Sequence, residues 1–334
     1  MSIEDRWSFD GMKVIFLRSD DLEISIIPEL GGVIWSIRQI EKNREILAKV
    51  KDPVPLSRLQ GLYPVKNLLD VVLVGGWYEV LPNVGYYSNY QGGEYGLHEE
   101  SVYVPWKAMY DSSLDESGIT LQVDLFKYPL TLTKHISLDG NKIIMHEQLR
   151  NKSDYDLDYA WLHHPTFGGD LIDETAEILI DDCEFEVDKY LPSDNATLKT
   201  GYRGKWPFCL DKQEKKVDLS RFPKRGEENS DDLVYIPSVT SGNFSIKNER
   251  IDLQFTAKWD KSVFPTLWMW RAFGAGKSYP YYGNIYGVAV EISTSYPSTG
   301  LAQQKQMGTA KRITGNSKVE TTLEFQVESL YKNS

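Results

Sequence analysis

The segment Thr131-Leu-Thr-Lys-His-Ile-Ser-Leu-Asp-Gly-Asn-Lys-Ile-Ile-Met-His-Glu-Gln-Leu149 contains two alternating runs separated by a turn signal. Leu132, Ile136 and Leu138 on one side, and Ile143, Met145 and Leu149 on the other, occupy alternate positions, which is the period of a half-buried strand. The dipeptide Asp139-Gly140 favours a tight turn, because glycine readily adopts the backbone conformations that hairpin turns need. The sequence therefore predicts a β-hairpin with strands over 131–138 and 142–149.

Similar alternation recurs along the chain, with turn-forming clusters between the runs. Further strands are expected over 119–126, 157–164, 178–187, 251–257 and 285–293. No segment shows a sustained stripe of apolar residues at a helical period, and the best helical candidate, 56–69, is weak. Consecutive strands separated by turns favour an all-β antiparallel sandwich or barrel over a βαβ fold. The polar stretch 212–232 is typical of a long surface loop, and strand patterning resumes after it. We therefore expect one domain over 1–334.

Composition narrows the class of protein. The chain has 334 residues, 41% of them hydrophobic, and a formal net charge of −11. An acidic chain without a basic face repels phosphate backbones, so nucleic acid is not expected as a partner. No apolar run reaches the roughly 18 residues of a membrane span, so no membrane partner is expected. The first residues lack a basic stretch followed by an apolar one, and we expect a cytoplasmic protein.

The cysteines and aromatic residues add two further expectations. Cys183 and Cys209 are the only cysteines, and we expect two free thiols rather than a disulfide. The chain has 20 Tyr and 9 Trp, a content that suits pleated sheets and also suits stacking on sugar rings. Composition alone favours the preference of aromatic residues for β-sheets over a role in sugar binding. No nucleotide cofactor is expected, because Gly276-Lys277-Ser278 lacks the first glycine of a phosphate-binding loop.

Two adjacent histidines stand in Trp161-Leu-His-His-Pro-Thr-Phe-Gly168. Successive residues of a strand point to opposite faces, so His163 and His164 cannot both enter one pocket. This separation argues against a metal site, and none is expected. His164 is the better candidate for a pocket, with His163 as its packed neighbour on the other face.

An isolated glutamate lies on the strand expected at 285–293. Val288, Val290 and Ile292 form one face, while Glu291 shares the other with small residues that leave room for a ligand. An exposed strand glutamate without function is the plain alternative. The nearby block Leu267-Trp-Met-Trp-Arg-Ala-Phe273 adds an aromatic platform in Trp270 and a guanidinium in Arg271.

Taken together, these blocks resemble the aldose 1-epimerase (galactose mutarotase) superfamily, and its uncharacterised epimerase-like branches above all. The similarity runs nearly end to end. It is carried by Leu22-Glu-Ile-Ser-Ile-Ile-Pro-Glu-Leu-Gly-Gly-Val-Ile-Trp-Ser36, Gly96-Leu-His-Glu99, His164-Pro-Thr-Phe167 and Val288-Ala-Val-Glu291. The resemblance implies a large antiparallel β-supersandwich that binds a small-molecule sugar on its concave sheet. It does not indicate whether the protein is a monomer or a homodimer.

The resemblance also implies a chemistry and a set of residues. Such enzymes interconvert the α and β anomers of a free aldose without a cofactor. Glu291 would take the proton of the anomeric hydroxyl while His164 protonates the ring oxygen. His98 would match a second histidine that hydrogen-bonds the substrate. Asn83 and Trp270 are further candidate contacts. Asp231 or Asp232 lies about where the family has a substrate-binding aspartate.

The chain departs from the family pattern where the substrate is recognised. No arginine lies between Arg58 and His98, and Arg271 is the candidate to supply that charge from another strand. Glu99 replaces a glycine and could narrow the pocket. Two alternatives therefore stay open. One is a carbohydrate-binding protein without catalysis. The other is glycan cleavage, which needs a second carboxyl group about 5–5.5 Å from the first in retaining enzymes.

Overall fold

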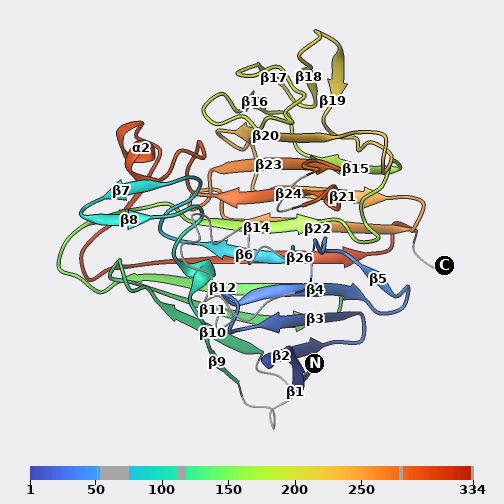
Figure 1. The fold of residues 1–334 in the computed structure, drawn as a ribbon. Coiled ribbons are helices and arrows are strands. Elements are labelled where there is room, and N and C mark those ends of the chain that lie inside the picture. Colours follow the sequence, from blue (N-terminus) through green and yellow to red (C-terminus); the bar gives the residue numbers. More distant parts are fainter. Residues whose placement is uncertain (51, 53–74, 111–117, 278–280, 332–334) are drawn as a thin grey trace.

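Residues 1–50, 52, 75–110, 118–277 and 281–331, as described by a computed structural model, form two large antiparallel β-sheets packed face to face (Figure 1). In the described part of the chain the first sheet has twelve strands. In spatial order it contains β1 (Ser2–Phe9), β2 (Met12–Arg18), β3 (Leu22–Ile27), β4 (Val33–Gln39), β6 (Trp77–Val80), β14 (Leu162–Phe167), β24 (Tyr286–Ser293), β23 (Thr266–Phe273), β20 (Ser230–Ile236), β16 (Glu184–Val187) and β17 (Arg203–Lys205), with β5 (Arg44–Glu45) beside β4.

The second sheet has eight described strands. Their order is β15 (Ala176–Leu179), β21 (Asn243–Asn248), β22 (Leu253–Trp259), β26 (Lys318–Glu328), β12 (Lys142–Asn151), β11 (Leu130–Asp139), β10 (Ile119–Asp124) and β9 (Lys107–Met109). Three two-stranded pairs complete the sheets: β13 (Leu157–Tyr159) with β25 (Lys311–Ile313), β18 (Phe208–Leu210) with β19 (Lys216–Asp218), and β7 (Ser88–Tyr90) with β8 (Gly93–Tyr95). A 3₁₀ turn covers Ser101–Tyr103, and a short helix, α2, covers Leu301–Gln306.

The expected hairpin is confirmed and lies in the middle of the second sheet. β11 and β12 pair from Asp139 opposite Lys142 onward, so alternate side chains such as Leu132, Ile136 and Met145 point into the core. Each fully buried side chain of this kind contributes roughly 1.5–3 kcal/mol by leaving water. The all-β antiparallel sandwich expected from the alternation is confirmed.

Two predictions of a single strand are wrong. In each case the structure has two shorter strands that pair with different neighbouring strands. The run 157–164 is interrupted at residues 160 and 161. β13 pairs with β25, whereas β14 joins the first sheet. The run 178–187 turns at Asp181 and Asp182, so that β15 and β16 lie in different sheets. Apolar and polar residues alternate on both sides of such a break. The alternation therefore does not reveal that the neighbouring strand changes.

Some sequence expectations remain open or gain detail. The weak helical candidate at 56–69 lies outside the described residues. The polar stretch 212–232 contains β19 and the beginning of β20. Both sheets take strands from distant parts of the chain, which favours one domain over 1–334, although this stays a prediction. Among the described residues, no helix has the length and apolar character to cross a bilayer.

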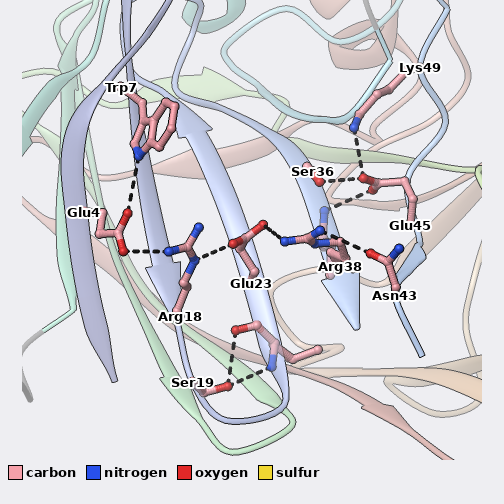
Figure 2. A network of polar contacts seen from close by, with 12 residues as sticks. Glu4, Trp7, Arg18, Ser19, Glu23, Ser36, Arg38, Asn43, Glu45 and Lys49 are labelled. Atoms are coloured by element: carbon pink, nitrogen blue, oxygen red, sulfur yellow. Dashed lines mark hydrogen bonds and ion pairs between the residues drawn. The ribbon is translucent and has the colours of Figure 1, made fainter. Parts of the chain in front are cut away.

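The first four strands carry a ladder of alternating charges on their outer face (Figure 2). Arg18 binds Glu4 at 2.6 Å, and Arg38 binds Glu23 at 2.7 Å. Arg18 also contacts Glu23, which joins the two pairs into one network. Surface pairs of this kind are worth at most about 1 kcal/mol each. Their main effect is to keep this outer face polar and charge-balanced.

The two thiols are free, as expected. Cys183 and Cys209 are both buried, at the end of the first sheet near β16 and β18. Burial raises the pKa of each thiol to about 11.

Candidate functional site

Five neighbouring strands of the first sheet bring one row of side chains to its outer face, away from the second sheet. Tyr78 on β6 is paired with His164 on β14. The register of β14 with β24 places His164 beside Glu291, because His163 pairs with Ile292 and Thr166 with Ala289. Glu291 is paired with Trp268, and Trp268 with Tyr235. The two residues expected to form an acid–base pair are therefore adjacent in this row.

His164 and Glu291 meet at a short distance in a buried setting. His164 Nε2 lies 3.6 Å from Glu291 Oε1, and only 8% and 2% of the two residues are exposed. The Nδ1 atom of His164 lies 3.3 Å from Thr166 Oγ1, which leaves Nε2 directed at the glutamate. The other carboxyl oxygen, Glu291 Oε2, has no hydrogen-bond partner among the described residues. A buried oxygen of this kind is costly unless a ligand satisfies it.

Burial decides the protonation of this pair. It lowers the pKa of His164 to about 4 and raises the pKa of Glu291 to about 8. Around neutral pH the pair therefore holds one dissociable proton, on the carboxyl group, beside a neutral imidazole. An imidazolium beside a carboxylate holds the same number of protons, so the two forms differ only in where the proton lies. Either partner can thus act as the acid while the other acts as the base.

His98 approaches this pair from the segment that follows β8. Its ring centroid lies 5.7 Å from that of His164. The backbone N–H of Gly85 donates to His98 Nδ1 at 3.2 Å, so a neutral ring carries its proton on Nε2. Burial and the neighbouring His164 lower the pKa of His98. His98 is therefore a neutral hydrogen-bond donor, as its assumed role requires.

An indole ring forms one wall of the site. The Trp270 ring lies 6.0 Å from the His164 ring and 6.1 Å from the Tyr281 ring, centroid to centroid. Trp270 Nε1 donates to Asp231 Oδ1 at 2.6 Å, which fixes the orientation of the indole. An aromatic face held in this way can stack on the C–H groups of a sugar ring.

A second wall, formed by lining residues within 188–200, is anchored by two carboxylates. Asp188 accepts hydrogen bonds from the backbone N–H groups of Tyr190 and Leu191 and from the Tyr235 hydroxyl. Asp232 accepts from the N–H groups of Thr197 and Leu198 and from the Thr197 hydroxyl, at 2.7–2.9 Å. The Asp232 carboxylate is thus occupied by the protein, and Asp231 is the carboxylate beside the aromatic wall.

These groups surround a cavity of about 360 Å³. Its lining includes His98, His164, Asp231, Asp232, Trp270 and Glu291. Apolar side chains complete the lining, and none of the described lining residues is a lysine or an arginine. The structure thus brings together five of the seven residues expected at the site, together with Asp231, the expected alternative to Asp232. It adds Asp188 and Tyr281 to the lining and Thr166 beside His164.

Asn83 and Arg271 are corrections to the expected site, because neither lines the cavity. The amide nitrogen of Asn83 donates to the carbonyls of Tyr86 and Gly96, and its oxygen accepts from the N–H of Leu301. Asn83 therefore holds the segments that carry Gly85 and His98. The buried guanidinium of Arg271 donates to the carbonyls of Leu219 and Arg221.

Glu99 also points away from the site. Its carboxylate binds Lys127 and accepts from the N–H of Gly96, and it does not line the cavity. The expectation that Glu99 narrows the pocket is therefore wrong.

Comparisons with known proteins identify the family and the fold of the chain. Residues 81–327 match the model of a family described as a domain of unknown function, DUF4432. No curated protein sequence matches the chain. A provisionally assigned aldose 1-epimerase from Klebsiella pneumoniae is 15% identical, with a TM-score of 0.72, over 97% of this chain and 83% of that one. A galactose mutarotase-like protein from Clostridium acetobutylicum is 14% identical, with a TM-score of 0.68, over 98% of each chain. The chain therefore belongs to the DUF4432 family and has the galactose mutarotase-like fold.

Proposed function

We propose that the protein interconverts the α and β anomers of a free aldose, with His164 and Glu291 as its acid–base pair. The observation that carries this proposal is their 3.6 Å contact at the floor of a cavity with an aromatic wall. Proton transfer between oxygens of a sugar needs an acid and a base but no cofactor. Each such group typically accelerates a reaction by about a hundredfold to ten thousandfold.

The proton balance follows from the neutral form of the pair. His164 Nε2 takes the proton of the anomeric hydroxyl while Glu291 gives its proton to the ring oxygen. The bond between C1 and the ring oxygen breaks, and the former hydroxyl becomes the carbonyl of the open aldehyde. Rotation about the C1–C2 bond exposes the other face of the carbonyl. Closure returns both protons, so the pair ends as it began.

The same steps run with the two roles exchanged when the proton lies on the imidazole. This second form is the one that the family resemblance implies, with Glu291 as the base and His164 as the acid. The pKa directions at His164 and Glu291 favour the neutral form as the resting state. His98 would donate to a sugar hydroxyl, Asp231 would accept from one, and Trp270 would stack on the ring.

The charges around the cavity favour an uncharged sugar. The carboxylates of Asp188, Asp231 and Asp232 line it, and the described lining contains no cationic side chain. Phosphate and carboxylate groups are usually recognised by arginine or lysine. A phosphorylated or acidic sugar would therefore meet repulsion instead of a partner.

Glycan cleavage by a retaining mechanism has no support in this arrangement. Such a reaction needs a second carboxyl group near the first. From the sequence, Glu99 and Asp232 are the candidates for that group. Both are engaged by the protein, because Glu99 binds Lys127 and Asp232 holds the wall segment.

Saturation-transfer NMR on a panel of free aldoses tests the proposal. The wild-type protein should accelerate exchange between the anomers of at least one sugar. His164→Ala or Glu291→Gln should lower that acceleration by a hundredfold or more, on the scale of general acid–base catalysis. His146→Ala, at an exposed strand position of the second sheet, is the matched control and should leave exchange unchanged.

Two results would contradict the proposal. Unchanged exchange in both site variants would remove His164 and Glu291 from the mechanism. Calorimetric binding of a sugar without any acceleration of its exchange would identify a carbohydrate-binding protein without catalysis.

A further inference from the structure

Behind the site, between the two sheets, lies a cluster of four buried ionisable side chains. Glu79 and His163 come from β6 and β14 of the first sheet, and Lys134 and Glu147 come from β11 and β12 of the second. Each residue is at most 3% exposed. Lys134 Nζ lies 2.8 Å from Glu79 Oε2, and His163 Nε2 lies 3.1 Å from Glu147 Oε2. Both ion pairs therefore cross from one sheet to the other.

Within this buried cluster the charges act on one another in both directions. Burial and the neighbouring Glu79 raise the pKa of Glu147. Against the effect of burial, Lys134 and His163 lower the pKa of Glu79. Also against burial, Glu147 and Glu79 raise the pKa of His163. Glu79, Glu147 and His163 offer ligand atoms within 4.8 Å of one another, but the ammonium of Lys134 already supplies a positive charge there. The four side chains thus form a charge-balanced link and do not suit a divalent cation.

Stability alone does not account for such a link. Removing charges from water is expensive, and well-packed apolar replacements of a buried ion pair are often neutral or stabilising. A core made of leucine and valine would hold the sheets together equally well. The position of the cluster in the fold therefore needs a separate explanation.

The pairing between β14 and β24 is interrupted where the cluster lies. Leu162 and His163 are paired with β24, as are Thr166 and Phe167, but His164 and Pro165 are skipped. Proline has no N–H to give to a neighbouring strand and is uncommon in central strands. His164 and Pro165 are thus not paired with the strand that carries Glu291, although the register is the same on both sides of this gap and both residues stay paired with β6.

We propose that the buried cluster of Glu79, Lys134, Glu147 and His163 positions His164 for proton transfer, by holding β14 against the second sheet at this interruption. His163 directly precedes His164 in the chain, and its ring lies in the cluster, where it contacts Glu147. Trp161, just before β14, ties the beginning of this strand to the cluster from within the first sheet, because its Nε1 donates to Glu79 Oε1 at 2.8 Å. These residues act through His164 and touch no substrate. The inference rests on the proposed function, the interconversion of sugar anomers.

A pair of variants at the His163–Glu147 contact tests this role. The double variant His163→Leu with Glu147→Leu replaces the pair by apolar side chains, which should keep the fold stable. We expect its kcat to fall by roughly tenfold to a hundredfold with little change in KM, because small misplacements of a catalytic group are costly. Glu147→Gln keeps an acceptor for His163 and should retain most of the wild-type kcat.

A control variant separates positioning from general loosening of the fold. Ile246→Ala removes buried atoms from β21, three strands away from β12 in the second sheet. It should lower Tm while leaving kcat unchanged at temperatures where the protein is folded. A wild-type kcat in the double leucine variant would overturn the proposal. So would a fall in kcat in Ile246→Ala equal to that of the double variant.

A measurement that does not depend on activity keeps this inference separate from the proposed function. The ¹⁵N chemical shifts of the His164 ring should change in the double leucine variant and stay at their wild-type values in Ile246→Ala. If no sugar is anomerised by the wild type, the proposed function fails and the ring shifts still report on His164. Wild-type ring shifts in the double variant would show that the cluster does not position His164.

Discussion

The two faces of β14 carry the same kinds of side chain in opposite circumstances. His163 meets Glu147 on the inner face at 3.1 Å, and His164 meets Glu291 on the outer face at 3.6 Å. The inner pair has Lys134 and Glu79 beside it, whereas the outer pair lines a cavity with no cationic side chain among its described lining. The pKa of His163 is raised and that of His164 is lowered.

This difference shows that residue type does not determine protonation. At the inner pair, two carboxylates outweigh the cost of burying an imidazolium. At the outer pair, burial is the dominant influence on both partners, so each tends toward its neutral form. The inner face is therefore suited to a permanent ionic link. The outer face is suited to a neutral imidazole beside a protonated carboxyl group, which are a base and an acid placed side by side.

The largest expected effect concerns stability after one partner is removed from each pair. Glu147→Ala removes the carboxylate that faces the buried His163 ring, while Lys134 keeps Glu79. It should lower the free energy of unfolding by about 3–5 kcal/mol. Glu291→Gln removes a carboxyl group whose Oε2 has no hydrogen-bond partner among the described residues, and should not lower the free energy of unfolding. Urea unfolding at pH 7 measures both values. Equal losses in the two variants would break the distinction between the two faces.

A smaller effect is expected in the pH dependence of stability. The pKa of Glu291 is raised to about 8, so its contribution to stability is complete below the unfolded pKa of about 4.5 and is lost as the pH rises through 8. The pKa of His164 is lowered to about 4, so its contribution is complete above the unfolded pKa of about 6.5 and is lost as the pH falls toward 4. From pH 4.5 to 6.5, Glu291 makes the free energy of unfolding fall with rising pH, whereas His164 makes it rise.

From pH 6.5 to 8 only the slope of Glu291 remains. Wild-type protein should therefore lose up to about 2 kcal/mol more stability over this interval than Glu291→Gln does. The difference between the two proteins removes the contributions of other titrating groups, including His163. Parallel curves for the two proteins would mean that Glu291 is already ionised at pH 6.5, and that the outer pair resembles the inner one.

The smallest effect concerns the hydroxyl that faces the outer histidine. Thr166→Val removes the Oγ1 atom that lies 3.3 Å from His164 Nδ1. The loss of one hydrogen bond, about 0.5–1.5 kcal/mol, should lower kcat by roughly twofold to tenfold. Thr256→Val, on the second sheet, is the control and should leave kcat unchanged. An unchanged kcat in Thr166→Val would show that the ladder of β14, and not Thr166, sets the ring orientation.

Sequence patterns predicted the parts of this fold that depend on local spacing. The hairpin of β11 and β12 followed from its alternation and from Asp139-Gly140. The breaks in 157–164 and 178–187 were missed, because alternation does not say which strand lies alongside. The helical candidate at 56–69 is not tested by the described residues.

The site divides in a similar way. Alternation placed His163 and His164 on opposite faces, and the structure confirms that separation. The same reasoning would have placed Arg271 opposite Trp270, so the two could not both have faced the cavity. The choice between Asp231 and Asp232 depends on how β20 is aligned with β23, which is a long-range property. The saturated hydrogen bonds of Asn83 come from three separate segments, and no sequence pattern reveals them.

The two buried thiols offer a practical consequence for studying ligand access. With a pKa of about 11 and exposures of 7% and 1%, Cys183 and Cys209 are almost entirely unreactive toward alkylating reagents at neutral pH. A substitution such as Leu191→Cys, at a rim residue that is 43% exposed, would then introduce the one readily labelled position in the molecule. Protection of that position by a sugar would report cavity occupancy directly, in native protein with no cysteine removed.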